Sequence, residues 1–193
     1  MIKIDTNLIP LSVTNFIEDL VKNKTNHSTD RIAPPFSFFY QESMTYNEPS
    51  SNDNDVGFSN CFIADFNSSY NFDYASCMEN ILYKVCSHYN IFVNRIHEGR
   101  IFLQPPSKFP LEQQLHVDIP DVPLDAPFYS LIYYISDSDG DTVFYKGDKE
   151  IKRVTPKKGT TVLFDGHLFH RGIKPINKTK ILLNFSFFGT PYN

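Results

Sequence analysis

Three residues in the second half of this 193-residue chain have the types and the order of a metal site. His116 and Asp118 are separated by one residue, and His170 follows much later in the chain. Two imidazoles and one carboxylate are the ligand set of a 2-His-1-carboxylate iron site, whose open positions can hold a 2-oxo acid and molecular oxygen. Lys180 comes soon after His170 and supplies the positive charge that an acidic cosubstrate requires.

The pair of His116 and Asp118 also has simpler explanations. Alternate residues of a strand point to the same face, so the two side chains project together if residues 115–119 form a strand. A histidine and an aspartate placed in this way can form an ordinary surface hydrogen bond, in a chain that has six histidines. Both residue types also bind zinc. The pattern alone therefore leaves iron, zinc and no metal open.

The elements that must position these residues are mostly strands. Short runs rich in β-branched and aromatic residues alternate with turn signals, which is typical of a sandwich or barrel. The run at 128–135 is apolar on both faces and is predicted to be a central strand. The predicted strands are residues 91–93, 101–104, 115–119, 128–135, 142–145, 151–154, 161–164 and 181–188.

Two helices are predicted before these strands. Residues 74–89 have the apolar spacing of an amphipathic helix, with Ser76 and Glu79 as a capping box. A shorter helix is predicted to begin with Thr14 or Asn15 as its cap. The predicted buried positions of the longer helix are Met78, Ile81, Leu82 and Val85.

The chain is predicted to be a single domain, 1–193, with the fold class mainly β (α+β). Residues 91–188 would form the core, and residues 1–90 a helical or irregular support that includes an aromatic strand within 36–40. The polar stretch 41–60 is predicted to be a long loop, either a solvated connection or a lid over a site.

Composition narrows the partners and the compartment. The net charge is −4 and no block of Lys and Arg stands out, so a nucleic-acid surface is not indicated. No apolar run approaches the roughly twenty residues that span a bilayer, and the N-terminus lacks the layout of a secretory signal. Three cysteines at wide spacing do not form a disulfide framework. We therefore expect a cytoplasmic protein without a membrane partner.

The C-terminal half contains six segments in a characteristic order: LHVD at 115–118, SLIYYI at 130–135, DGDTVFY at 139–145, PKKG at 156–159, VLFDGHLFH at 162–170 and KILLNF at 180–185. In order and spacing they resemble the double-stranded β-helix (jelly-roll, cupin-like) core of the 2-oxoglutarate- and iron(II)-dependent oxygenases. The prolyl-hydroxylase-like branch of that superfamily is the most similar. The resemblance covers nearly all of the C-terminal half and fits the first ninety residues only loosely.

The resemblance implies that His116, Asp118 and His170 bind iron(II), and that 2-oxoglutarate chelates the iron. The last histidine of the family pattern precedes the strand that carries the cosubstrate anchor, which selects His170. His167 is then expected to be a turn residue beside Gly166, with a substrate contact near the mouth of the site as the second alternative.

The resemblance also implies which residues hold the cosubstrate. Lys180 stands where most relatives carry an arginine that pairs with the distal carboxylate of 2-oxoglutarate. Lysine offers a compact ammonium rather than a planar fork, so weaker 2-oxoglutarate binding or another 2-oxo acid is expected. Tyr134 matches a family tyrosine whose hydroxyl reaches the cosubstrate. Asn184 shares the strand face of Lys180 and could add a hydrogen bond.

The implied activity is hydroxylation of a C–H bond, in a prolyl residue of a peptide or in a small metabolite. Succinate and carbon dioxide would be released, and ascorbate would stimulate the enzyme. Two alternatives stay open: a catalytically inactive jelly-roll binding module, and a cupin-like zinc enzyme. The substrate is not specified by the sequence. Arg95, His97, Arg100 and Gln104 precede His116 and are candidates for the mouth of the site.

Overall fold

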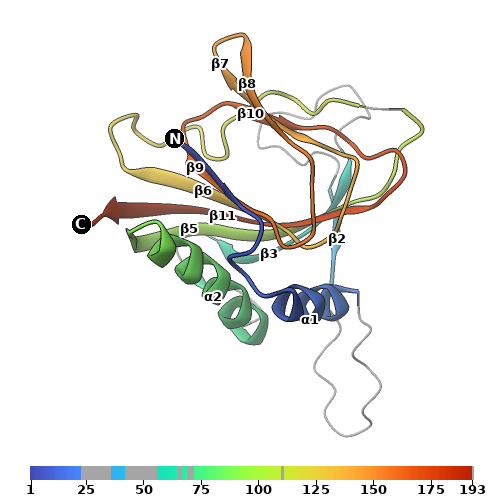
Figure 1. Cartoon of the computed structure of the whole chain (residues 1–193), viewed down its shortest axis with the longest axis horizontal. Helices are drawn as coiled ribbons and strands as arrows, with labels where there is room; N and C mark the ends of the chain where they lie inside the picture. Colours follow the sequence, from blue (N-terminus) through green and yellow to red (C-terminus); the bar gives the residue numbers. More distant parts are fainter. Residues whose placement is uncertain (23–35, 42–55, 65–66, 69–71, 110, 193) are drawn as a thin grey trace, which may run out of the picture.

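The computed structural model describes residues 1–22, 36–41, 56–64, 67–68, 72–109 and 111–192. Within them the chain forms a large and a small antiparallel sheet, and two helices lie against the outer face of the large sheet (Figure 1). The architecture is mainly β. The predicted double-stranded β-helix, or jelly-roll, is confirmed.

The strands of each sheet come from distant parts of the sequence. The path across the large sheet is β1 (Ile2–Asp5), β9 (Thr161–Asp165), β6 (Phe128–Tyr134), β11 (Lys180–Pro191), β5 (Ile91–Gln104), β3 (Gly57–Ala64) and β2 (Phe39–Gln41), and β4 (Asn67–Ser68) pairs with β3. The small sheet consists of β10 (His170–Gly172), β7 (Thr142–Lys146) and β8 (Lys149–Val154). His170 is therefore the first residue of a strand in the small sheet, and Lys180 is the first residue of a strand in the large sheet.

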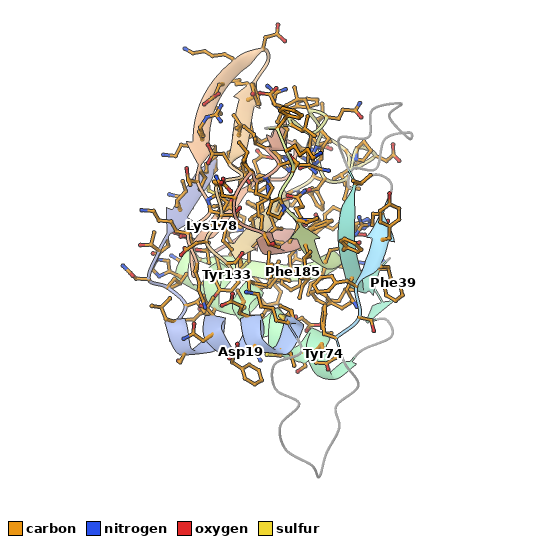
Figure 2. All side chains as sticks on the ribbon, turned by 90° about the vertical axis from the view of Figure 1, so that its right-hand side faces the viewer. Asp19, Phe39, Tyr74, Tyr133, Lys178 and Phe185 are labelled. Carbon is orange, nitrogen blue, oxygen red and sulfur yellow. The ribbon has the colours of Figure 1, made fainter. Side chains whose placement is uncertain are left out.

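The large sheet buries a different cluster on each face, because alternate residues of a strand point to opposite sides. On β6, Leu131 and Tyr133 pack into the cluster that includes helices α1 (Leu11–Val21) and α2 (Phe72–His88). Tyr133 is labelled in this layer in Figure 2. Ile132 and Tyr134 instead pack with residues of the small sheet. The predicted central position of this strand is confirmed.

Strand β11 follows the same rule and divides into two rows. Its helix-side row is apolar and consists of Ile181, Leu183, Phe185 and Phe187. The opposite row faces the small sheet and consists of Lys180, Leu182, Asn184 and Ser186. The polar members of this row are also buried, so the space between the sheets is partly polar.

Several predicted boundaries were wrong. The strands predicted at 91–93 and 101–104 are one strand, β5, whose length lets it pair with both β11 and β3. The first ninety residues add strands to the sheet: β1 pairs with β9, and β3 with β2 extends the sheet beyond β5. The predicted loop 41–60 is shorter, since residues 57–60 begin β3; residues 42–55 lie outside the described residues.

Both helices begin before their predicted caps. Helix α1 starts at Leu11 after Pro10, whose ring fixes φ near the helical value, so Thr14 lies inside the helix. Helix α2 starts at Phe72, so Ser76 and Glu79 also lie inside it and form no capping box at its start. Its predicted core positions are confirmed: Met78, Ile81, Leu82 and Val85 are buried.

Cys61, Cys77 and Cys86 are free thiols. In the part of the chain that the structure describes, neither helix has the length and apolar character needed to cross a bilayer.

Thr14 joins helix α1 to the sheet through a buried hydrogen bond with the hydroxyl of Tyr133. In Thr14→Val the shape is kept but the buried phenol loses this partner. We expect a free energy of unfolding lower by about 1–3 kcal/mol, measured by urea denaturation. Adding Tyr133→Phe should recover part of the loss, because no unsatisfied hydroxyl is then left. Strictly additive losses would contradict a direct bond.

Candidate metal centre

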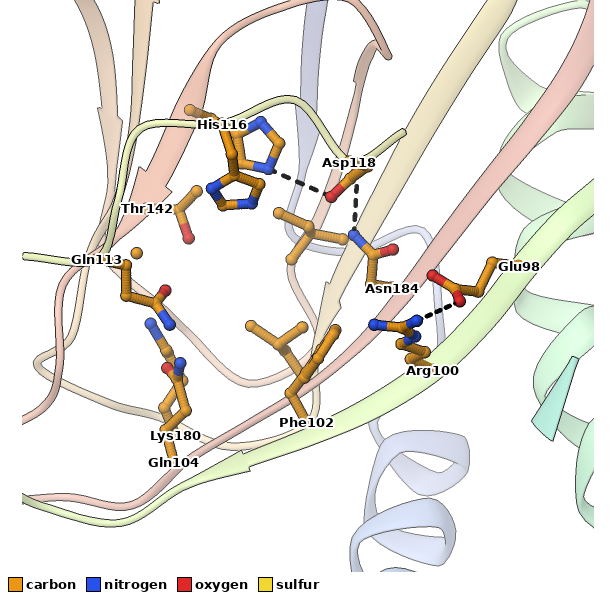
Figure 3. A pocket seen from close by; sticks show the side chains of 14 residues that line it. Glu98, Arg100, Phe102, Gln104, Gln113, His116, Asp118, Thr142, Lys180 and Asn184 are labelled. Atoms are coloured by element: carbon orange, nitrogen blue, oxygen red, sulfur yellow. Dashed lines mark hydrogen bonds and ion pairs between the residues drawn. The ribbon is translucent and has the colours of Figure 1, made fainter. Parts of the chain in front are cut away.

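The two histidines lie side by side because their main chains pair. The His116 N–H donates to the His170 carbonyl at 3.0 Å, and the His170 N–H donates back to His116 at 2.9 Å. This exchange joins the segment before β6 to strand β10 of the small sheet. It places the ring centroids of the two imidazoles 4.6 Å apart, above the cavity shown in Figure 3.

Each imidazole is held in one orientation by a carbonyl group two residues earlier. Nδ1 of His116 lies 2.9 Å from the Gln114 carbonyl oxygen, and Nδ1 of His170 lies 3.0 Å from that of Leu168. A carbonyl oxygen can only accept, so Nδ1 carries the proton in both rings. The lone pair of the neutral imidazole is then on Nε2, which is the arrangement of metal-binding histidines.

Asp118 completes the cluster. Its Oδ1 lies 3.5 Å from Nε2 of His170, and the candidate ligand atoms of His116, Asp118 and His170 all lie within 4.8 Å of one another. Asn184 donates to the other carboxylate oxygen, Oδ2, at 3.4 Å. These three residues can therefore hold one metal ion, with the carboxylate oriented from behind by an amide.

The metal-free cluster is held together by charge. Burial would raise the pKa of Asp118, but the charge of His170 and its hydrogen bond outweigh burial and hold that pKa well below its usual range. Burial would lower the pKa of His170, and Asp118 overcomes this and raises it. A proton on Nε2 of His170 thus occupies the position that a cation would take.

The predicted strand at 115–119 was wrong, although its consequence was right. The structure pairs Glu112 with Ile173 and His116 with His170, so the register slips by one residue between these two bridges. The slip interrupts the ladder, and Pro120 cannot donate a hydrogen bond to extend it. His116 and Asp118 still project toward the same point, although residue 116 forms only an isolated bridge and residue 118 lies in a bend.

A cavity of about 70 Å³ lies below the cluster, between the two sheets. Figure 3 shows polar side chains at both of its ends and the ring of Phe102 between them. The lining residues are Glu98, Arg100, Phe102, Gln104, Gln113, His116, Asp118, Ile132, Thr142, His170, Gly172, Lys180, Leu182 and Asn184.

Lys180 and Gln104 lie opposite one another on neighbouring strands and form one end of the cavity. The Lys180 side chain is 1% exposed, and its ammonium donates to the carbonyl oxygens of Gly140 at 3.2 Å and Ile173 at 3.1 Å. An ammonium group has three donors, so one more can reach a ligand. Burial lowers the pKa of Lys180 to about 7, against the opposing effect of Asp141.

The other two predicted cosubstrate contacts occupy different places. Tyr134 is fully buried and does not line the cavity; its hydroxyl donates to Thr142 at 2.8 Å, and Thr142 does line it. Asn184 lines the cavity but contacts Asp118, at the metal end rather than beside Lys180. Tyr134 can thus act on a ligand only through Thr142 in this structure.

His167 lies in the turn after β9, as predicted. Its Nε2 is 3.2 Å from the carbonyl oxygen of Ala126, and its main-chain N–H donates to Asp165. Because its ring is engaged with Ala126, His167 takes no part in the cluster with His116.

Of the four candidates for the mouth, Arg100 and Gln104 line the cavity, whereas Arg95 and His97 are not among its described lining residues. Strand alternation explains this, since Arg100 and Gln104 share one face of β5. The same alternation would have added Glu98, which the sequence reasoning missed. Gln113 and Thr142 were also missed. Thr142 lies in the segment 139–145 that carries the resemblance, whereas Gln113 lies in none of the six segments.

No protein-family model matches the sequence, and no curated protein matches it by sequence. Solved structures do match. A prolyl-4-hydroxylase from Pseudomonas putida is 13% identical with a TM-score of 0.59, covering 97% of this chain and 91% of the other. The viral collagen prolyl hydroxylase of Paramecium bursaria Chlorella virus-1, in its 2-oxoglutarate complex, is 13% identical with a TM-score of 0.56, covering 97% and 94%.

A third match is a prolyl hydroxylase from Trichoplax adhaerens, in complex with a peptide fragment of the hypoxia inducible factor oxygen degradation domain. It is 15% identical with a TM-score of 0.59, covering 97% of this chain and 83% of the other. At these identities the comparison concerns the fold. The chain has the fold of the prolyl-hydroxylase-like 2-oxoglutarate and iron(II) oxygenases, as its sequence motifs predicted.

The charge coupling in the metal-free cluster can be measured directly. We expect His170 to titrate above 6.5 in an NMR pH titration, and below 6.5 in Asp118→Asn, where burial acts without the carboxylate. An unchanged pKa of His170 in the variant would contradict the coupling.

The same coupling predicts a pH window for stability. The raised pKa of His170 stabilises the folded protein below pH 6.5 and is lost as the pH rises through the folded value. The lowered pKa of Asp118 stabilises above pH 3.8 and is lost as the pH falls through its folded value. Asp118→Asn should therefore lower the metal-free melting temperature more at pH 5.5 than at pH 8.5.

Proposed function

We propose that this chain is a non-haem iron(II), 2-oxoglutarate-dependent oxygenase that hydroxylates a C–H bond. The observation that carries the proposal is the arrangement of His116, Asp118 and His170 over a cavity that contains a buried lysine. The proposed metal ligands are these three side chains, through two Nε2 atoms and one carboxylate oxygen.

The donor set suits iron(II). Two neutral imidazoles and one carboxylate neutralise part of the charge of a divalent cation and leave coordination positions open toward the cavity. The Nδ1 bonds to carbonyl oxygens keep both rings ready without reorganisation. Asn184 holds the carboxylate of Asp118, so the ligand oxygen is fixed in place.

The far end of the cavity suits the distal carboxylate of a 2-oxo acid. The third ammonium proton of Lys180 can donate to that carboxylate, in place of the arginine of most relatives. Gln104 supports this role, because its buried Oε1 has no hydrogen-bond partner among the described residues. Half a turn of the amide presents its NH₂ group to an anion instead. Thr142, positioned by Tyr134, is a further hydroxyl contact.

When bound, iron(II) and 2-oxoglutarate supply an oxidation in which 2-oxoglutarate, oxygen and a C–H bond become succinate, carbon dioxide and a C–OH group. The role of the protein is to position the substrate and the cosubstrate and to keep water away from the metal. Phe102, Leu182 and Ile132 form the apolar middle of the cavity and exclude water beside the metal. We also propose that residues 91–188 are the functional core of a single domain, and that ascorbate stimulates the reaction.

A direct test mixes the pure protein with iron(II), ascorbate and 2-oxoglutarate in air and measures succinate. We expect succinate above the protein-free rate, and loss of both succinate and stoichiometric metal binding in His170→Ala. His167→Ala is the matched control and should retain both, since its ring contacts Ala126 instead. Zinc binding without 2-oxoglutarate binding would favour a zinc enzyme; absence of both would favour an inactive binding module.

The buried lysine gives 2-oxoglutarate binding a definite pH dependence. A carboxylate at Lys180 favours the ammonium form, so above pH 7 binding must take up a proton, and the affinity should fall by at most about tenfold per pH unit. Below pH 6 the lysine is already charged and no uptake is expected. Anaerobic calorimetry in buffers of different ionisation enthalpy measures this uptake.

Lys180→Met tests whether Lys180 is the group that takes up a proton when 2-oxoglutarate binds. It should raise the Kd for 2-oxoglutarate by about tenfold or more and abolish the proton uptake, while metal binding persists. Lys178→Met removes an exposed lysine two residues away and should change neither. Proton uptake that survives in Lys180→Met would assign it to another group and count against Lys180 as the anchor.

A further inference from the structure

On the metal side of Phe102 the cavity is also lined by two charged side chains, Glu98 and Arg100, to which the proposed function assigns no role. On β5 the inward row runs Glu98, Arg100, Phe102 and Gln104, and β11 places Ser186, Asn184, Leu182 and Lys180 opposite these residues in turn. Phe102 and Leu182 therefore separate two polar groups of side chains. Figure 3 shows Lys180 and Gln104 on one side of Phe102, and Glu98 and Arg100 on the other.

Glu98 and Arg100 form a close ion pair. Nη2 of Arg100 lies 2.5 Å from Oε1 of Glu98, and both side chains line the cavity. The Glu98 side chain is 9% exposed and that of Arg100 is 21% exposed. On the neighbouring strand β3, the Cys61 thiol lies 3.8 Å from the Glu98 carboxylate. The pair is thus largely removed from solvent and faces the cavity.

Stability alone does not account for this pair. Removing two charges from water costs free energy that the mutual attraction of the pair often fails to recover. Both side chains line the cavity, and because a guanidinium has five donors and a carboxylate accepts several hydrogen bonds, each can contact a ligand in addition to its protein partners. Ser186, opposite Glu98, adds a fully buried hydroxyl that has no hydrogen-bond partner among the described residues.

The charges of the pair select the charges of a ligand. A ligand with only a carboxylate would bind Arg100 next to the Glu98 carboxylate and be repelled by it. A ligand with only an ammonium group would bind Glu98 and be repelled by the adjacent guanidinium of Arg100. A ligand with both charges satisfies both side chains and adds no net charge to a buried site. Because Glu98 and Arg100 are in contact, the two ligand charges must also be adjacent, as they are in an α-amino acid.

We propose that Glu98 and Arg100 form the substrate subsite, and that the substrate is a free α-amino acid whose ammonium binds Glu98 and whose carboxylate binds Arg100. This inference rests on the proposed oxygenase function and specifies its substrate class. A peptide segment has neutral amides in place of these charges, and it would have to reach two mostly buried side chains from the surface.

The position of Arg100 connects this subsite to the metal centre. Arg100 lies opposite Asn184 in the sheet, and Asn184 contacts Asp118. The α-ammonium and α-carboxylate of an amino acid bound to Glu98 and Arg100 would therefore be separated from the proposed metal ligand Asp118 by the Asn184 side chain. The side chain of the amino acid extends into the cavity, where a C–H bond can approach the open metal positions.

Binding to the metal-free protein tests the subsite without depending on turnover. Saturation-transfer NMR would screen the standard L-α-amino acids in small groups. The best of them would be compared with its N-acetyl form, its amide, and the doubly blocked N-acetyl amide. We expect the free amino acid to bind at least tenfold more tightly than any blocked form. A capped proline-containing peptide is the competing probe.

Variants then assign the binding to the pair. Arg100→Gln and Glu98→Gln should each weaken amino-acid binding tenfold or more, and Arg100→Lys should restore part of it because the charge is kept. Glu150→Gln makes the same chemical change in an exposed pair with Arg153, outside the cavity, and should have no effect. Melting temperatures and 2-oxoglutarate binding of each variant show that the fold and the other end of the cavity are intact.

The outcomes separate this inference from the proposed function. Equal binding of free and blocked forms, preference for the capped peptide, or no binding of any amino acid by a protein that binds metal and 2-oxoglutarate overturns the amino-acid subsite and leaves the oxygenase standing. Failure to bind metal and 2-oxoglutarate overturns the oxygenase, whereas amino-acid binding that depends on Arg100 would still support a subsite. Stimulation of succinate release by the same amino acid supports both.

Discussion

The main-chain exchange between His116 and His170 is the contact on which the candidate site depends. It joins a segment that belongs to no regular strand to the small sheet, and it brings together two imidazoles from distant parts of the sequence. The orientation of each ring is then set by a carbonyl oxygen two residues earlier in its own segment. A rigid jelly-roll is needed to hold these two segments in register, and this is why the large core matters to a small cluster.

Much of this arrangement could be predicted from the sequence, because the relevant signals are local. The run at 128–135, which is apolar on both faces, predicted a central strand, and the spacing of His116 and Asp118 predicted their common direction. The register slip near Gln113 and the joining of two predicted strands into β5 could not be predicted. They depend on which strand each segment meets across the sheet, and that information is not local.

The same distinction applies to the cavity. Motif reasoning identified Lys180 and the two histidines, and it pointed to Arg100 and Gln104 without a role for either. It placed Asn184 beside Lys180, because both share one face of β11. The structure instead shows that the face is long enough to have two ends, with Asn184 at the metal end. The alternation of a strand shows which face a residue occupies. Its position along the cavity depends on which residue of the partner strand lies opposite, and the sequence alone does not give that.

The buried Lys180 lowers the stability of the folded protein, and the proposed binding of a carboxylate gives a reason for its presence. A pKa lowered from 10.5 to about 7 means that the charged form is disfavoured in the folded protein by about 5 kcal/mol relative to the unfolded chain. A hydrophobic residue at this position would avoid that cost. The position is nevertheless occupied by a lysine that donates two hydrogen bonds to main-chain oxygens and also lines the cavity. In the proposed oxygenase, a carboxylate bound to Lys180 would offset this cost, so the end of the cavity that lowers stability would also be the end that is selective for a carboxylate.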